Sequence, residues 1–302
     1  MNKLITLLAV LCLLSGFVSS KKQTIAERNK IITTTNAAKL PEDLLYNNEP
    51  IPDECMNELV PIICASIDSK EIDLDTFFIS KTQSDIIFSD EQFKYEWSYI
   101  GTLPNGNHLV YGYLWPAGAM GKFTEIAVIR RTGNKLTALA WIQGGDRHAT
   151  MIASHSCHLH ENVLTYEQHM TNGSLYETLM KQFPECSSYA ENKNNEELFW
   201  GEGDYLGYGT FEITITPNDK LKNHHLKSFT FADFGSDPES KESYHEWIKK
   251  TPKGSHTMGY AFNQILKLYS YKNGNRKFNI TQLKEIIITA CDYAKEREIA
   301  SH

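Results

Sequence analysis

The sequence predicts an α+β protein with a central antiparallel β-meander, barrel-like or strongly curved, between a short N-terminal helical segment and C-terminal helices. Between residues 91 and 236, apolar and polar residues alternate, and turns rich in Gly, Asn and Pro separate the runs. From residue 237 onward, apolar residues recur at the three- and four-residue spacing of a helix.

Residues 1–20 have the pattern of a cleavable signal peptide. Lys3 precedes an apolar run over residues 4–14, and Val18 and Ser20 suit the −3 and −1 positions of a cleavage site before Lys21. The apolar run is shorter than the roughly 20 residues that span a bilayer, and no later run is longer. We therefore expect an exported protein, periplasmic or secreted, without a transmembrane segment after signal cleavage.

Acidic side chains outnumber basic ones. The full chain has 30 Lys and Arg, 37 Asp and Glu, and a net charge of −7. Removing residues 1–20 takes away Lys3 alone, which leaves 29 basic against 37 acidic residues and a charge of −8. Because such a chain is repelled by phosphate backbones, we expect no nucleic-acid partner. A small molecule or another protein remains open as the partner.

Residues 21–90 are predicted to form a polar leader and then a short helical segment pinned by cysteines. Asp53 suits the N-cap of a helix, and Met56 and Leu59 begin an apolar stripe that Pro61 interrupts. Such a segment is expected to serve structure rather than chemistry.

Five cysteines follow the signal peptide, and export would allow disulfides between them. Cys291 belongs to the apolar face of a predicted helix, so we expect it to be a buried, unpaired thiol. The other four allow three pairings. We favour Cys55–Cys64 and Cys157–Cys186, because each closes a short loop.

The β domain is predicted to span residues 91–236. Asn105-Gly106 and Gly133-Asn134 lie between runs of aromatic and β-branched residues, which is typical of hairpin turns. The expected strands cover residues 97–100, 108–115, 123–130, 136–142, 149–159, 163–170, 208–216 and 227–234.

Residues 237–302 are predicted to form a helical segment that packs on the β domain. One helix is expected to end near Asn273-Gly274, and a last one to begin near Thr281. Their apolar stripes are Tyr260, Phe262, Ile265, Leu266 and Tyr269 in the first helix, and Leu283, Ile286, Ile287, Ala290, Cys291 and Ala294 in the second.

The predicted 149–170 hairpin holds the densest group of reactive side chains. With Glu161-Asn162 as a two-residue turn, alternation assigns Cys157, Leu164 and Tyr166 to a core face. The opposite face carries imidazoles and a carboxylate, which are ligands for zinc or another divalent transition metal. The candidate ligands are His158, His160, Glu167 and His169. A polar sheet face in contact with solvent has the same pattern, so this alternative stays open.

A second candidate site combines aromatic rings, glycines and carboxylates in residues 199–209. Rings between glycines can stack on a sugar or another flat ligand, while neighbouring carboxylates accept hydrogen bonds from it. The candidate ligand-binding residues are Trp200, Glu202, Asp204, Tyr205 and Tyr208. The same glycines can equally serve sharp bends and close packing of the backbone.

Two functions fit these observations. The first is a non-enzymatic exported protein that binds a ligand or partner through its β domain. The second is a metal-dependent, hydrolase-like enzyme that uses the histidine cluster of the hairpin. Because the chain contains no complete catalytic motif, we assign no catalytic residue and favour the first function.

Overall fold

The computed structural model describes residues 40–59, 70–83, 93–116, 122–145, 150–186, 205–232, 258–273 and 276–298. The chain divides into two compact units, Met1–Pro41 and Glu42–His302. All the helices and strands described below belong to the second unit. The predicted signal peptide lies outside the described residues. None of the helices within the described ranges is long and apolar enough to cross a membrane.

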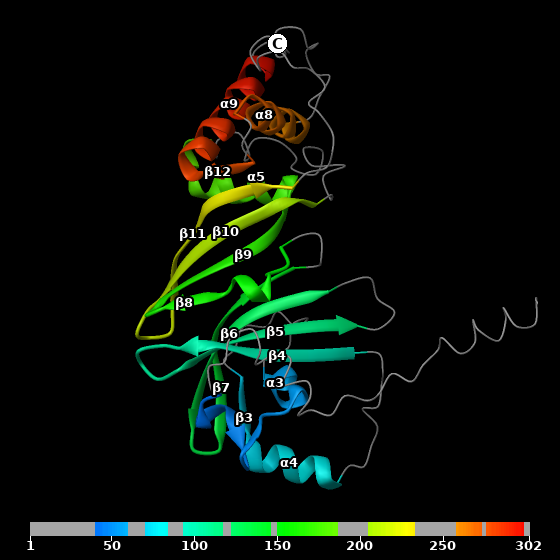
Figure 1. The fold of residues 1–302 in the computed structure, drawn as a ribbon, viewed down its shortest axis with the longest axis vertical. Coiled ribbons are helices and arrows are strands. Elements are labelled where there is room, and N and C mark those ends of the chain that lie inside the picture. Colours follow the sequence, from blue (N-terminus) through cyan, green and yellow to red (C-terminus); the bar gives the residue numbers. More distant parts are fainter. Residues whose placement is uncertain are drawn as a thin grey trace, which may run out of the picture. The chain divides into compact units, whose positions relative to one another are not determined.

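Two antiparallel five-stranded sheets form the body of this unit (Figure 1). The first sheet has the order β3-β7-β6-β5-β4, with bounds Glu71–Asp73, Lys135–Gln143, Phe123–Thr132, His108–Pro116 and Phe93–Thr102. The second has the order β12-β11-β10-β9-β8, with bounds Lys277–Asn279, Leu221–Phe231, Tyr205–Ile215, Val163–Thr171 and His158–His160. The α+β class and the antiparallel pairing predicted from the sequence are thus present.

The predicted barrel is not formed, because both sheets are open in the described part of the chain. Strand β7 ends at Gln143, and the 3₁₀-helix Ser154–Ser156 replaces most of the strand expected over residues 149–159. Only β8, three residues long, remains of that strand, and it pairs with β9 rather than with β7. This break divides the expected meander into two sheets.

The hairpin turns agree with their sequence signals. Gly106 and Gly133 have φ values of 87° and 62°, in the left-handed region that glycine adopts without steric cost. In the 149–170 hairpin, His158 lies opposite Thr165 and His160 opposite Val163, as the two-residue turn requires. The predicted register of that hairpin is therefore correct, although its first strand is short.

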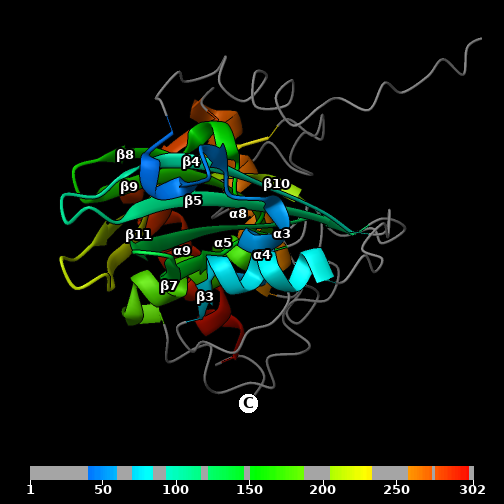
Figure 2. The ribbon, with the colours of Figure 1, turned by 90° about the horizontal axis from the view of Figure 1, so that it is seen from below.

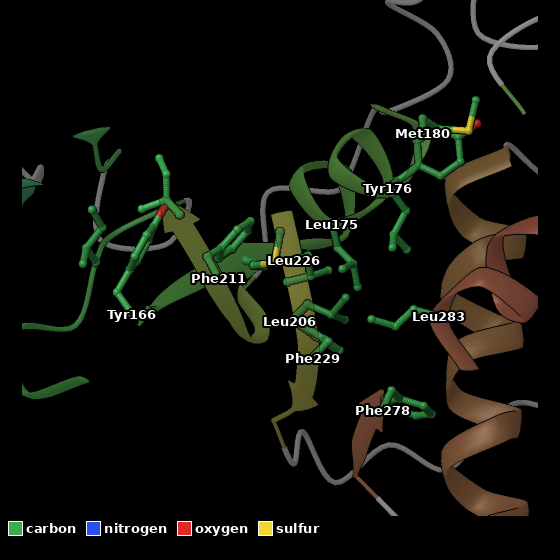
Figure 3. Close-up of a cluster of buried hydrophobic side chains, with 14 of the residues drawn as sticks. Tyr166, Leu175, Tyr176, Met180, Leu206, Phe211, Leu226, Phe229, Phe278 and Leu283 are labelled. Carbon is green, nitrogen blue, oxygen red and sulfur yellow. The ribbon is translucent and has the colours of Figure 1, made fainter. Parts of the chain in front are cut away.

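Three helices cover the second sheet: α5 (Asn172–Gln182) and α9 (Ile280–Glu298) contact its strands, and α8 (Met258–Asn273) packs on α5 and α9 (Figures 1 and 3). The last two match the predicted C-terminal helices, and α5 was not predicted. The Thr171 side chain accepts a hydrogen bond from the Ser174 backbone N–H, and the Ser174 side chain accepts one from the Thr171 backbone N–H, so the pair forms a capping box. The buried stripe of α5 is Leu175, Tyr176, Leu179 and Met180.

A continuous apolar core joins the two sheets and these helices (Figure 3). The rings of Tyr166 on β9 and Phe211 on β10 stack with centroids 5.6 Å apart, and Tyr111 on β5 contributes from the first sheet. The Tyr111 hydroxyl donates a hydrogen bond of 3.1 Å to the Ile152 carbonyl. The connection between the sheets is thereby fixed to the first sheet.

Residues 42–59, here called the strap, cover the other face of the first sheet. They contain the 3₁₀-helix Glu42–Leu44, the strands β1 (Leu45–Tyr46) and β2 (Glu49–Pro50), and α3 (Asp53–Leu59), which contacts β4 and β7 (Figure 2). The helix α4 (Leu74–Gln83) follows β3. The side chains that the strap buries are Leu44, Ile51, Cys55, Met56 and Leu59. Apolar burial therefore holds the strap in place.

Backbone carbonyls of the strap are fixed by two side chains of the first sheet. The Trp97 indole N–H donates a hydrogen bond of 2.9 Å to the Ile51 carbonyl. The Arg131 guanidinium donates to the carbonyls of Glu42 and Asp43 in the 3₁₀-helix and of Leu45 directly after it. These bonds satisfy polar groups that the strap would otherwise bury unpaired.

The expected disulfides Cys55–Cys64 and Cys157–Cys186 are not formed, because neither Cys55 nor Cys157 is joined to another cysteine. Cys55 is enclosed by the packing of α3, and the Cys157 thiol donates to the Ala153 carbonyl over 3.7 Å. Burial raises the pKa of Cys157 to about 12, which keeps the thiol protonated and unreactive. Cys64 lies outside the described residues. Cys291 is buried and forms no disulfide, as predicted.

The β4–β5 turn is tied to the β10–β11 turn by a shared carboxylate. Asp219 Oδ1 accepts hydrogen bonds from the side-chain amides of Asn105, over 2.8 Å, and Asn107, over 2.7 Å. The Asn105 amide also donates to the Pro217 carbonyl over 3.2 Å. This turn clamp joins the two sheets at the ends of two hairpins.

Substitution Asp219→Ala is expected to lower the free energy of unfolding by about 1–3 kcal/mol, because it leaves two amides without their acceptor. Urea denaturation measures the change. Asp219→Asn is the matched control, since Asn keeps an acceptor oxygen and tolerates the φ of 59° at this position. Equal losses from the two substitutions would contradict the role of the shared carboxylate.

Candidate functional site

Three half-buried rings gather on the polar face of the second sheet. The His169 ring lies 4.9 Å from the Tyr205 ring and 4.9 Å from the Tyr208 ring, between centroids. The two tyrosine rings are 5.3 Å apart and nearly perpendicular, at 76°. We call His169, Tyr205 and Tyr208 the ring cluster. The cluster brings together residues of both sequence-predicted sites: His169 from the hairpin and the two tyrosines from the aromatic stretch.

Strand register explains the cluster. His169 on β9 lies directly opposite Tyr208 on β10, and a register shift between Tyr205 and Gly207 brings the second tyrosine to the same side. Glycines flank Tyr208 for a steric reason. A Cβ at Gly207 would lie 2.1 Å from the Thr230 carbonyl oxygen, and one at Gly209 would lie 2.4 Å from the Met170 sulfur. The glycines therefore allow close packing beneath the rings.

Polar side chains continue the same face away from the rings. Glu167 lies opposite Thr210, and the next row pairs Thr165 with Glu212. Lys227 Nζ forms a 2.6 Å ion pair with Glu212 Oε2, so the Glu212 carboxylate is already engaged within the protein. The Glu167 backbone N–H donates to Ser156 Oγ over 2.7 Å, which fixes this part of β9.

Burial raises the pKa of the Tyr205 phenol, and the neighbouring Tyr208 phenol and Glu167 carboxylate raise it further. Tyr205 therefore stays protonated over the physiological range, and its hydroxyl oxygen is buried. Together with Glu167 and Thr210, the cluster offers ring faces, a carboxylate and hydroxyl groups on one sheet surface.

The predicted metal ligands do not converge. His158 and His160 are exposed on β8, next to the turn. His158 lies opposite Thr165 on β9, and His169 lies four residues further along β9. Four residues of an antiparallel strand span about 14 Å, which is far longer than metal–ligand bonds of about 2 Å can bridge. No group of three or more His, Cys, Asp or Glu residues suited to a metal ion occurs within the described ranges. The expected site over His158, His160, Glu167 and His169 is therefore not assembled there.

The other ligand-binding candidates, Trp200, Glu202 and Asp204, lie outside the described residues. Tyr205 and Tyr208 remain as the described members of this site.

A buried carboxyl group on the central strand β6 was not predicted from the sequence. Glu125 is 1% exposed and accepts a hydrogen bond of 3.3 Å from the Tyr95 hydroxyl. A Cβ at Gly112 would lie 2.5 Å from that hydroxyl and 2.9 Å from Glu125 Oε1, so only glycine leaves room for the pair. Burial raises the pKa of Glu125 to about 8, against a partial opposing effect of the Tyr95 hydrogen bond. The group is therefore protonated at neutral pH.

The sequence does carry a signal for Glu125. It is the one charged residue within the apolar run of residues 123–129, and an isolated carboxyl group in a strand buried on both faces has to be protonated or paired. Alternation alone places Glu125 on the face opposite Ile126, but it does not reveal that both faces are covered. Tyr95 lies thirty residues earlier, so no local pattern indicates the pair.

Comparison of the chain with protein-family models, with curated proteins and with the solved structures found no match. Function is therefore inferred from the residues and the geometry of the molecule itself.

The free energy of unfolding is expected to fall as the pH rises from about 4.5 to about 8, because the unfolded chain loses the Glu125 proton while the folded chain retains it. Glu125→Gln keeps the acceptor for Tyr95 but cannot ionise, so the variant should be more stable than the wild type at pH 8. Each pKa unit corresponds to about 1.4 kcal/mol, so the expected gain is several kcal/mol.

Denaturation curves across this pH range measure the effect. Glu49→Gln is the control, because Glu49 is exposed on β2 and should leave the pH dependence unchanged. If the free energies of unfolding of the wild type and of Glu125→Gln change with pH in parallel, Glu125 ionises in the folded protein as it does in water, which would contradict the prediction.

Proposed function

We propose that the protein is an exported binding protein whose ring cluster holds a small ring-shaped polar ligand of the saccharide class. The observation that carries the proposal is the grouping of three half-buried rings beside a carboxylate on one sheet face. Rings that are only packing elements are normally buried in the core, as Tyr166 and Phe211 are here.

Saccharides suit such a surface because they have an apolar C–H face and a rim of hydroxyl groups. The C–H face stacks on aromatic rings, and the hydroxyls donate to carboxylates and exchange hydrogen bonds with Tyr and Thr side chains. Glu167 supplies an acceptor and Thr210 a hydroxyl on the same face, beside the ring of Tyr208. A highly anionic ligand fits less well, because Glu167 and the net charge of −7 oppose it.

The alternative of a metal-dependent hydrolase has less support. Its four candidate ligands are spread along β8 and β9, and His169 packs against two tyrosine rings. Of these residues, His169 and Glu167 fit a role in ligand binding better than a role in coordinating a shared metal ion.

Tyr208→Ala is expected to weaken saccharide binding by about tenfold or more, because loss of a stacking contact costs about 1–3 kcal/mol of binding free energy. A glycan array followed by titration calorimetry on the best saccharide measures the change. Tyr208→Phe keeps the ring and should retain most of the affinity, which separates stacking from hydrogen bonding by the phenol.

Tyr271→Ala is the matched control, because Tyr271 is 45% exposed on α8, away from the second sheet's polar face. Its affinity should equal that of the wild type. If the wild type binds no saccharide in the array, or Tyr208→Ala binds as well as Tyr271→Ala, the proposed ligand class is wrong.

Export is tested separately, by expressing the full chain with its own N-terminus in a secreting host. The exported product is expected to begin at Lys21, because Val18 and Ser20 suit the signal peptidase. N-terminal mass spectrometry identifies the first residue. Val18→Arg should block cleavage, and retention of the wild type inside the cell would contradict export.

A further inference from the structure

We infer that Thr102, His108 and Asp43 form a second, catalytic site that transfers acyl groups from small esters. Thr102 ends β4, His108 begins β5, and Asp43 belongs to the strap. Residues from three separate segments thus meet in one hydrogen-bonded chain. The inference is independent of saccharide binding, which involves the opposite sheet.

The three side chains are joined in the order of a nucleophile, a base and an orienting acid. Thr102 Oγ1 lies 2.9 Å from His108 Nδ1, and His108 Nε2 lies 3.2 Å from Asp43 Oδ2. A hydroxyl group within hydrogen-bond reach of an imidazole that is itself oriented by a carboxylate is the arrangement that activates Ser and Thr nucleophiles. The geometry alone defines it, whatever the order of the residues in the chain.

Burial differs among the three residues: the His108 ring is enclosed, whereas the Thr102 and Asp43 side chains reach solvent. His108 is 4% exposed, so its ring is held rigidly by the packing of β5. Thr102 is exposed, so an ester in solution can reach its hydroxyl. The backbone around Asp43 is fixed, because the Arg131 guanidinium donates hydrogen bonds to the carbonyls of Glu42, Asp43 and Leu45.

Tyr99 completes the chain of hydrogen bonds. Its hydroxyl lies 2.6 Å from Thr102 Oγ1, and its ring contacts the His108 ring edge-on at 6.2 Å. All the bonds are satisfied when Tyr99 donates to Thr102, Thr102 donates to His108 Nδ1, and His108 Nε2–H donates to Asp43. Tyr99 thereby holds Thr102 Oγ1 in position beside the imidazole.

The reaction balances without a cofactor. Thr102 Oγ1 attacks the ester carbonyl carbon while its proton passes to His108 Nδ1, and Asp43 stabilises the imidazolium. The bond to the leaving alcohol then breaks, and His108 returns the proton to that alcohol. Water attacks the resulting threonine ester in the same way, which releases the carboxylic acid and restores Thr102.

The test uses the mature full-length protein, with p-nitrophenyl acetate as the substrate and a fluorophosphonate as the covalent probe. We expect hydrolysis above the buffer rate and a single adduct on the peptide that contains Thr102. Thr102→Ala should lower the enzymatic rate by about 10²–10⁴-fold and remove the adduct, because general-base activation is lost with the hydroxyl. Thr102→Ser should retain both, since a less hindered hydroxyl takes the same place.

Two further variants separate catalysis from folding. Thr132→Ala is the matched control, because Thr132 is an exposed threonine at the end of the neighbouring strand β6, and it should react as the wild type does. Asp43→Asn should slow labelling about 10²-fold or more, since the amide no longer orients the imidazole correctly. Its melting temperature is measured in parallel.

An adduct on another residue, or no hydrolysis above the rate of Thr102→Ala, overturns the inference. So does an Asp43→Asn variant that is less stable yet labels at the wild-type rate, because the chain of hydrogen bonds would then only attach the strap to the sheet.

Discussion

Strands β5 and β6 of the first sheet are buried on both faces, and this double burial obliges the chain to supply two covering layers. One face, with Leu109, Tyr111 and Ile126, shares the core of the second sheet. The other face, with Val110 and Ala127, is covered by the strap, which includes α3. Neither layer is optional, because removing either would expose a β-branched and aromatic surface to water.

Polar groups on these strands then need partners in places that water does not reach. Glu125 is protonated and bonded to Tyr95, and Gly112 provides the space for that pair. His108 is placed between Thr102 and Asp43, which joins the sheet to the strap. The double burial thus accounts for the protonated Glu125–Tyr95 pair. It also accounts for the proposed acyl-transfer site, because a buried imidazole such as that of His108 is oriented by hydrogen bonds to both of its nitrogens.

Local patterns predicted much of the fold, and long-range relations account for what was missed. Alternation and turn glycines located the hairpins of β4–β5 and β6–β7, and helical periodicity located α8 and α9. The helix α5 was missed because Asn172-Gly173 at its start resembles a turn, although its apolar stripe is clear in retrospect. The prediction of a barrel was wrong because alternation indicates where strands lie but not where a meander divides into two sheets.

The candidate sites show the same limit. Tyr205, Tyr208 and His169 were each identified from the sequence, yet they were divided between two sites, because only the register of β9 with β10 brings them together. The metal site was expected because three histidines and a glutamate share a face, but sharing a face fixes direction and not distance. Asp43 and Thr102 gave no signal at all, since they lie 65 and 6 residues from the imidazole they contact.

The two proposed sites occupy surfaces whose supporting layers are already satisfied. The rings of the cluster lie above a face that Met170 and Phe229 pack from below, and Thr102 projects from a strand end whose neighbour Leu103 is buried. Substitutions at exposed or half-exposed groups of this kind usually change stability by well under the amounts caused by core changes. Loss of binding or of labelling in a folded variant can therefore be assigned to the site, because the covering layers that hold the fold do not depend on those side chains.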